Sequence, residues 1–118
     1  MVQKNKLIIR EINNGFMADD VDAIMQHIAS DVRWDVMGAF TANGKDEFRK
    51  AIHHDDFEPR PVISILNEVA EGDFVAIEGT VSSKMKRGSL FEAFFHNLYR
   101  LENGKVKEMR SYVIPKSQ

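Results

Sequence analysis

Helical spacing of apolar residues dominates the first part of the chain. The first expected helix ends near Gly15 and has its apolar side chains at Leu7, Ile8, Ile12 and Phe16. A second expected helix repeats the i, i+3, i+4, i+7 pattern at Val21, Ile24, Met25 and Ile28. Asp19 is the expected N-cap of this second helix, because an aspartate side chain accepts a hydrogen bond from a free backbone N–H group of the first turn.

Alternation of apolar and polar residues replaces helical spacing at residues 31–37, which predicts a half-buried strand. A third helix is expected over residues 44–53, with Asn43 as its N-cap. The segment 53–61 follows and contains two of the three prolines of the chain, which predicts a loop.

Extended segments fill the chain from residue 62 onward. Turn signals separate them at Gly72-Asp73, at residues 86–88 and at Asn103-Gly104, and an Asn-Gly pair is a strong signal for a hairpin. Helices that come first and an antiparallel sheet that follows predict an α+β fold. With no linker and no repeat, we expect a single domain over residues 1–118.

Both faces of the expected sheet carry apolar residues. The face with fewer charges should meet the helices, and it contains Val75, Ile77, Phe95, Tyr99, Met109 and Val113. The opposite face keeps apolar side chains among its charges, at Phe74, Phe94, Leu98 and Tyr112. A sheet that is apolar on both sides needs a second covering layer, and another copy of the chain would supply it. We therefore expect a homodimer through the outer face of the sheet.

Composition removes several classes of function. The chain has 118 residues, of which 43% are apolar and 29% charged, and its formal net charge of -2 gives no general attraction for nucleic acid or anionic lipid. The absence of cysteine excludes thiolate catalysis, Fe–S clusters and cysteine zinc sites. We expect no cofactor, no nucleic-acid partner and no membrane partner. The N-terminal apolar stretch, residues 7–9, is too short for a secretory signal, so we expect a cytoplasmic protein.

Four strings in order along the chain carry a resemblance to a known family: MADDVDAIMQHIASDVRWDVMG, NGKDEFRKAI, NEVAEGDFVAIEGTV and FHNLYRLENGKVKEMRSYV. The chain resembles the nuclear transport factor 2-like superfamily, in its SnoaL-like and ketosteroid-isomerase-like branch. This resemblance implies a cystatin-like α+β barrel, in which a cone-shaped curved sheet wraps around the N-terminal helices and encloses an apolar pocket. Such pockets serve steroid isomerisation, polyketide cyclisation, epoxide hydrolysis or ligand holding, and the fold does not choose among them.

The catalytic residues that the resemblance implies are replaced in this chain. Val36 stands where ketosteroid isomerases have their catalytic aspartate, and Ile12 stands where they have a tyrosine donor. Gly79 and Val81 occupy the positions of the arginine and aspartate of limonene-epoxide-hydrolase-like members, and Ser111 occupies that of the partner aspartate. None of these mechanisms therefore carries over.

The expected pocket residues follow from face assignment and from the resemblance. The candidates for ligand binding are Trp34, Val36, Phe57, Phe95, Asn97, Tyr99 and Ser111. Trp34 is expected either as a flat wall for a ligand or as a core residue, and the neutral polar groups either hold a ligand or bond one another. Asp35 and His54 are the candidates for a general base, and Asp35 would face the pocket only if the first strand shifted by one residue. Neighbouring histidines and aspartates at residues 53–56 point in different directions, which argues against a metal site.

Three functions remain open at this point. The first is a SnoaL-like protein that binds a small hydrophobic or aromatic molecule in its pocket. The second is a small isomerase, cyclase or hydrolase that uses Asp35 or His54 as base and Tyr99 or Asn97 as donor. The third is a dimeric interaction module without enzymatic activity.

Overall fold

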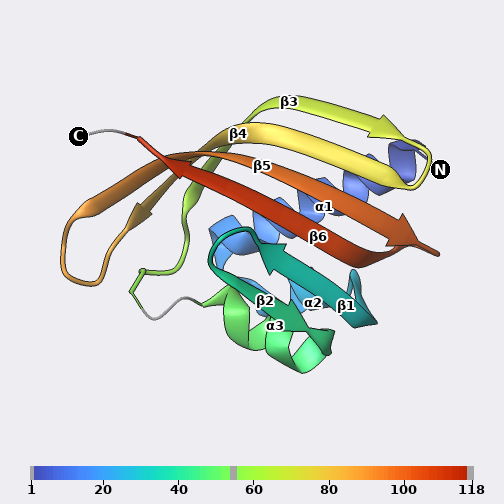
Figure 1. Cartoon of the computed structure of the whole chain (residues 1–118), viewed down its shortest axis with the longest axis horizontal. Coiled ribbons are helices and arrows are strands. Elements are labelled where there is room, and N and C mark those ends of the chain that lie inside the picture. The colour runs from blue at the N-terminus through green and yellow to red at the C-terminus, as the bar shows by residue number, and fades with distance from the viewer. Residues whose placement is uncertain (1, 54–55, 117–118) are drawn as a thin grey trace.

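A six-stranded, curved, open sheet and three helices make up the computed structural model, which describes residues 2–53 and 56–116 (Figure 1). The elements in chain order are α1 (Val2–Ala18), α2 (Val21–Met25), β1 (Ile28–Val36), β2 (Phe40–Asn43), α3 (Gly44–Ile52), β3 (Val62–Glu71), β4 (Phe74–Lys84), β5 (Leu90–Glu102) and β6 (Lys105–Pro115). The expected α+β class, with N-terminal helices on a curved sheet, is confirmed. Within the described ranges, no helix combines the length and the apolar run needed to cross a bilayer.

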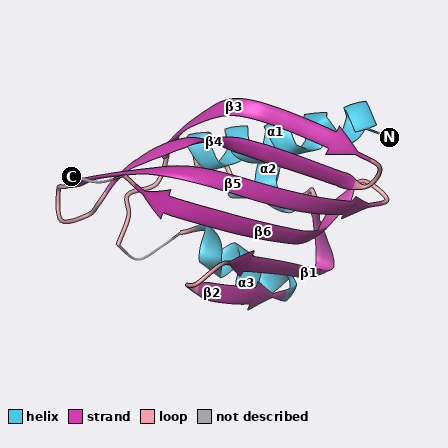
Figure 2. Cartoon of the chain, turned by 45° about the horizontal axis from the view of Figure 1, so that its top comes forward, coloured by secondary structure: helices cyan, strands magenta, loops and turns pink. Residues whose placement is uncertain are grey.

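The sheet has the strand order β2-β1-β6-β5-β4-β3, and the helices lie on one side of it (Figure 2). Strands β3 to β6 form an antiparallel meander joined by the expected turns. The expectation of a wholly antiparallel sheet is wrong at one place, because β1 pairs with β6 in the parallel direction. The chain leaves β1 through β2 and α3 and begins the meander at the far edge of the sheet, so its last strand returns beside its first.

The boundaries of α1 and α2 differ from the sequence-based expectation, and α1 continues past Gly15 to Ala18. Helix α2 ends at Met25 rather than continuing to Ile28, which instead begins β1. Its N-cap is Asp20 rather than Asp19, and the Asp20 carboxylate accepts a hydrogen bond from the backbone N–H of Ala23 at 3.1 Å. Asp19 has a left-handed backbone with φ of 54°, which turns the chain from α1 into α2. Strand β2 was not expected from the sequence pattern.

The core lies between the helices and the inner face of the sheet. Apolar side chains of α1, α2 and α3 pack there against alternate residues of the strands, in one cluster that includes Ile9, Ile12, Ile24, Phe48, Val75, Ile77, Leu101 and Val106. The alternation expected in β4 and β5 is therefore confirmed. Burying a side chain of this size stabilises the folded state by about 1.5–3 kcal/mol.

Gly79 fixes the local shape of the sheet beside the cavity. A Cβ atom at this position would lie 2.1 Å from the Ser64 carbonyl oxygen and 2.9 Å from the ring of Phe95. The ring of Phe95 thus lies against the backbone of β4, where any other residue would displace it. Strand β3 has a register irregularity between Ile65 and Asn67 at the same level.

Candidate functional site

An apolar cavity of about 270 Å³ lies between the helices and the inner face of the sheet. Its wall combines α1, α3, the segment before β3 and all six strands, and consists of Asn13, Phe16, Trp34, Val36, Phe40, Ala51, Ile52, Phe57, Pro61, Ile63, Val81, Ser83, Phe95, Asn97, Met109, Ser111 and Val113. None of these residues carries a charge. A hollow of this composition is typical of a site for a small molecule.

The structure brings most of the sequence-predicted ligand residues together on this wall. Trp34, Val36 and Phe57 line the cavity, as do Phe95, Asn97 and Ser111. Tyr99 does not line it, because its side chain is fully buried, with 0% of its surface exposed. What the wall binds remains a prediction.

Trp34 packs in the cavity wall against aromatic rings from three elements. The centroid of its ring system lies 4.9 Å from that of Phe48 in α3, 5.8 Å from that of Phe40 in β2 and 6.3 Å from that of Phe16 in α1. The contacts with Phe40 and Phe16 are edge-to-face and that with Phe48 is tilted, and such ring contacts stabilise the packing of the indole. Trp34 therefore serves the core and the cavity wall at once.

A hydrogen bond across the sheet joins two cavity residues. The indole N–H of Trp34 donates to Ser111 Oγ at 2.9 Å, and both side chains are buried. Since Ser111 Oγ already accepts this bond, its own hydroxyl proton is available to donate to another acceptor. Asn97 lies directly opposite Ser111 in the register of β5 and β6. The cavity wall thus offers a hydroxyl donor beside a carboxamide.

The second polar contact points away from the cavity. Asn97 Nδ2 donates to the phenol oxygen of Tyr99 at 3.0 Å. Burial raises the pKa of Tyr99 well above its ordinary value, so the phenol stays neutral at physiological pH. This bond uses the amide group of Asn97 as a donor, and its Oδ1 keeps the capacity to accept a hydrogen bond. Asn13 of α1 adds another neutral carboxamide to the same wall.

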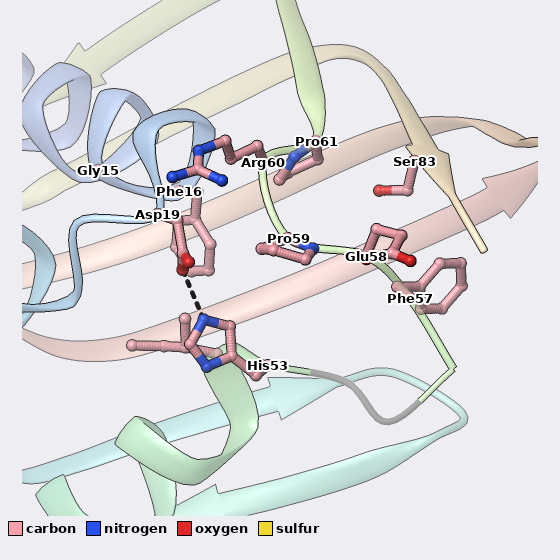
Figure 3. A pocket seen from close by; sticks show the side chains of 11 residues that line it. Gly15, Phe16, Asp19, His53, Phe57, Glu58, Pro59, Arg60, Pro61 and Ser83 are labelled. Atoms are coloured by element: carbon pink, nitrogen blue, oxygen red, sulfur yellow. Dashed lines mark hydrogen bonds and ion pairs between the residues drawn. The ribbon is translucent and has the colours of Figure 1, made fainter. Parts of the chain in front are cut away.

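Beside the cavity lies a second hollow, which we call the mouth, and its lining differs in charge from that of the interior. This hollow of about 140 Å³ adjoins the cavity, and the two share Phe16, Ile52, Phe57, Pro61 and Ser83 as lining residues (Figure 3). The other residues that line this mouth include charged or titratable ones, at Asp19, His53, Glu58 and Arg60. His53 Nε2 and Asp19 Oδ1 lie 2.5 Å apart.

Asp35, one of the two candidate bases, lies on the side of β1 away from the cavity. Trp34 and Val36, its neighbours in β1, line the cavity, so the strand has the register that places Asp35 outside. Its carboxylate accepts hydrogen bonds from the Thr41 hydroxyl and from Arg33 Nε. These contacts, that of Thr41 foremost, hold the pKa of Asp35 below its usual range. The structure thus gives Asp35 no access to the hollow.

His54, the other candidate base, lies outside the described residues, as does Asp55 of the 53–56 segment. Among the residues that the structure does describe, no three histidine, aspartate or glutamate side chains gather closely enough to hold a metal ion.

Several wall residues and the mouth pair escaped the sequence-based prediction. Asn13 and Phe16 follow Ile9 at i+4 and i+7, so their common helical face could have been found from spacing. The pair formed by Asp19 and His53 had no such signal, because 34 positions separate the two residues.

Comparisons with known proteins agree with this architecture. An NTF2-like protein of unknown function from Burkholderia pseudomallei is 20% identical, with a TM-score of 0.84 over 93% of this chain and 90% of that one. An LEH-like epoxide hydrolase from M. tuberculosis is 13% identical, with a TM-score of 0.84 over 95% and 84%. A protein from Xanthomonas campestris, provisionally described as a polyketide cyclase, is 18% identical, with a TM-score of 0.84 over 93% and 90%.

These likenesses show a shared fold and leave the reaction open. No curated protein matches the chain. A family model does match it, over residues 9–109, and its description is SnoaL-like domain. Since the match spans most of the 118 residues, the chain belongs to the SnoaL-like domain family, within the superfamily that the sequence resembles.

Proposed function

We propose that the protein binds a small, uncharged, largely apolar molecule in the 270 Å³ cavity. The observation that carries this proposal is the wall itself, in which aromatic and aliphatic side chains surround a few neutral polar groups. A charged ligand group would lose its hydration in this interior without meeting a countercharge, which is strongly unfavourable. An apolar body would be stabilised by leaving water.

The size of the cavity and the polar groups in its wall further restrict the class of ligand. An engineered apolar cavity of about 150 Å³ holds a benzene molecule, so a cavity of 270 Å³ fits a body of about two fused rings. A carbonyl on this body would accept a hydrogen bond from Ser111, and a hydroxyl would donate one to Asn97. An oxygenated aromatic molecule agrees with the provisional description of two neighbours in fold, from Xanthomonas campestris and Jannaschia, as polyketide cyclases.

Trp34 allows a direct test, because it is the single tryptophan of the chain and lies in the cavity wall. The bicyclic ketone 2-tetralone should quench Trp34 fluorescence and raise the melting temperature. The matched anion 1,2,3,4-tetrahydro-2-naphthoate should bind at least about tenfold more weakly, because its carboxylate finds no partner in the interior. Equal binding of the two compounds, or no response to 2-tetralone, would contradict the proposal.

A cavity-filling variant gives an independent test of the location. Val36→Phe adds a ring inside the cavity and should abolish the Trp34 response to 2-tetralone. Val2→Phe makes the same substitution at an exposed position of α1 and should leave the response unchanged. Retained binding in Val36→Phe would place the ligand elsewhere.

We also propose that two copies of the chain associate through the outer face of the sheet. Large apolar side chains are exposed on that face, among them Phe74, Phe94, Tyr112 and Ile114. Phe94, Tyr112 and Ile114 border a groove on that face, together with Leu66 and other neighbouring residues. An apolar surface of this kind is typical of an interaction site.

Light scattering at micromolar concentration tests the association. The wild-type chain should have the mass of a dimer, and Phe94→Asp should have that of a monomer. Leu7→Asp introduces the same charge at an exposed apolar position of α1 and should remain dimeric. A monomeric wild type would overturn this second proposal and leave the cavity proposal intact.

A further inference from the structure

A further hollow, which we call the lateral groove, lies beside the cavity between α1 and the edge strand β3. Its volume is about 370 Å³. Helix α1 packs here against β3 and β4, behind this edge of the sheet (Figure 2). Three apolar side chains line the lateral groove together with three asparagines, Asn13, Asn14 and Asn67, and with the ion pair of Arg10 and Glu68. The lateral groove therefore offers many more hydrogen-bonding groups than the cavity does.

The lateral groove and the cavity meet at Asn13, which lines both of them. On α1, Phe16 lines the cavity and the next residue, Met17, lines the lateral groove. On β3, Ile63 lines the cavity, and Ile65, two residues further along the strand, lines the lateral groove. The two hollows thus follow one another along the same helix and the same strand.

Asn13 has hydrogen-bonding groups that the rest of the chain does not use. The residue is only 7% exposed, yet its carboxamide makes no hydrogen bond to another residue in the part of the chain that the structure describes. Polar groups this deeply buried nearly always have a partner, because a missing hydrogen bond costs free energy. The two donors and the oxygen acceptor of the carboxamide therefore indicate a partner that comes from outside the chain.

An ion pair lies in the lateral groove one turn of α1 before Asn13. Arg10 Nη2 donates to Glu68 Oε1 at 2.9 Å, and the Glu68 side chain is 13% exposed. This contact leaves other N–H groups of the guanidinium and the second carboxylate oxygen for a ligand. A hydroxyl group can accept from the first and donate to the second. A charged group would meet a like charge from one member of the pair, so the lateral groove favours an uncharged group.

We propose that the lateral groove binds an uncharged, hydroxylated substituent of the molecule whose apolar body lies in the cavity. This inference rests on the proposed binding of an apolar molecule in the cavity, and it narrows the ligand class to an aromatic or bicyclic body with a short polyol side chain. Asn13 bonds the hydroxyl group nearest the body, and the ion pair of Arg10 and Glu68 bonds the next one.

Two ethers of 2-naphthol test this inference, because they share the bicyclic body and the length of the side chain. The first, 3-(2-naphthyloxy)propane-1,2-diol, has two hydroxyl groups where the second, 2-(2-methylbutoxy)naphthalene, has two methyl groups. Naphthyl fluorescence, excited beyond the absorption of Trp34, measures both dissociation constants. The wild-type protein should bind the diol at least as tightly as the alkyl ether. An apolar groove would instead favour the alkyl ether about tenfold or more, because each methyl group is stabilised by leaving water.

Variants of the lateral groove locate the hydroxyl groups. Asn13→Leu should lower the preference for the diol over the alkyl ether about fivefold, the equivalent of one neutral hydrogen bond. Asn5→Leu is the matched control, because Asn5 is also a 7% exposed asparagine of α1 but lines neither hollow, and it should keep the wild-type preference. The double variant Arg10→Met with Glu68→Met removes both charges together and should also lower the preference about fivefold.

The anion (2-naphthyloxy)acetate tests the expected lack of charge on the substituent. It should bind more weakly than the diol, because Glu68 repels its carboxylate. Tighter binding of the anion than of the diol would overturn the hydroxylated class of substituent.

The remaining outcomes distinguish this inference from the proposed function. A tenfold preference of the wild-type protein for the alkyl ether, or an unchanged preference in Asn13→Leu, would overturn the role of the lateral groove and leave the cavity proposal standing. Binding of 2-tetralone without binding of either ether would do the same. Failure of 2-tetralone and of both ethers to bind would count against both proposals.

Discussion

Similar apolar residues on the two faces of the sheet have different surroundings, and two neighbouring phenylalanines of β5 show the difference. Phe95 points inward, is 8% exposed, lies against Gly79 and lines the cavity. Phe94 points outward and is 49% exposed, with the ammonium of Lys116 4.9 Å from its ring centroid. The same side chain thus contributes to folding on one face and remains available for association on the other.

Truncation of each phenylalanine should break this comparison most clearly. Phe95→Ala should lower the free energy of unfolding by about 3 kcal/mol, because it removes buried contacts and enlarges the cavity. Phe94→Ala should change the stability of the monomer by about 0.5 kcal/mol or less, as expected for an exposed position. Urea unfolding of both variants at low protein concentration measures the difference. Equal losses would show that the outer face is also part of the core.

Gly79 sharpens the contrast at the level of the backbone. Gly79→Ala should destabilise the protein by about 2 kcal/mol, since its Cβ would meet the Ser64 carbonyl oxygen and the Phe95 ring. Thr80→Ala alters the next residue of β4, which faces outward, and should cost about 0.5 kcal/mol or less. Urea unfolding checks both values. If Gly79→Ala left the free energy of unfolding unchanged, β3 would be able to move away from β4 without loss of stability.

Sequence patterns predicted the faces of the strands well, because alternation decides which side each residue occupies. They could not predict which strands become neighbours. The bond from Trp34 to Ser111 joins residues 77 positions apart, and it depends on the parallel pairing of β1 with β6. Alternation within either strand contains no information about that pairing. The inward-facing strand residues of the cavity wall were therefore predictable from alternation, whereas the hydrogen bonds between them were not.

The mouth was harder to predict for a related reason. The sequence pattern predicted Asp19 as the N-cap of α2, because an aspartate is a preferred N-cap residue. In the structure Asp20 takes that role, and the left-handed backbone of Asp19 directs its carboxylate to His53. A shift of one residue in a cap thus converts an expected structural carboxylate into part of a charged site. Local propensity alone could not decide between the two aspartates.

Ser111 tests the polar part of the inner face. Ser111→Ala should weaken binding of 2-tetralone about fivefold, the equivalent of one neutral hydrogen bond of about 1 kcal/mol. Binding of the hydrocarbon tetralin, which has no carbonyl, should stay unchanged. Ser111→Ala should also lower the free energy of unfolding, measured in urea, by about 1–2 kcal/mol, because the Trp34 indole N–H loses its acceptor. Ser82→Ala, on the outer face, is the matched control, and equal weakening of ketone and hydrocarbon would contradict a donor role for Ser111.

The smallest expected effect on stability comes from substitution of Asp35, which lies on the side of β1 away from the cavity. Hydrogen bonds from Thr41 and Arg33 hold its pKa below the usual range, so the carboxylate stabilises the fold above an unfolded-state pKa of about 3.9. That contribution is lost as the pH falls through the lowered pKa of the folded state. Asp35→Asn should therefore be slightly less stable than wild type at pH 7 and equally stable at strongly acidic pH. Urea unfolding across this range tests the sign, with Asp73→Asn, in the turn between β3 and β4, as the charge-matched control. A gap that persisted in acid would mean that Asp35 stabilises the strand through packing rather than through its charge.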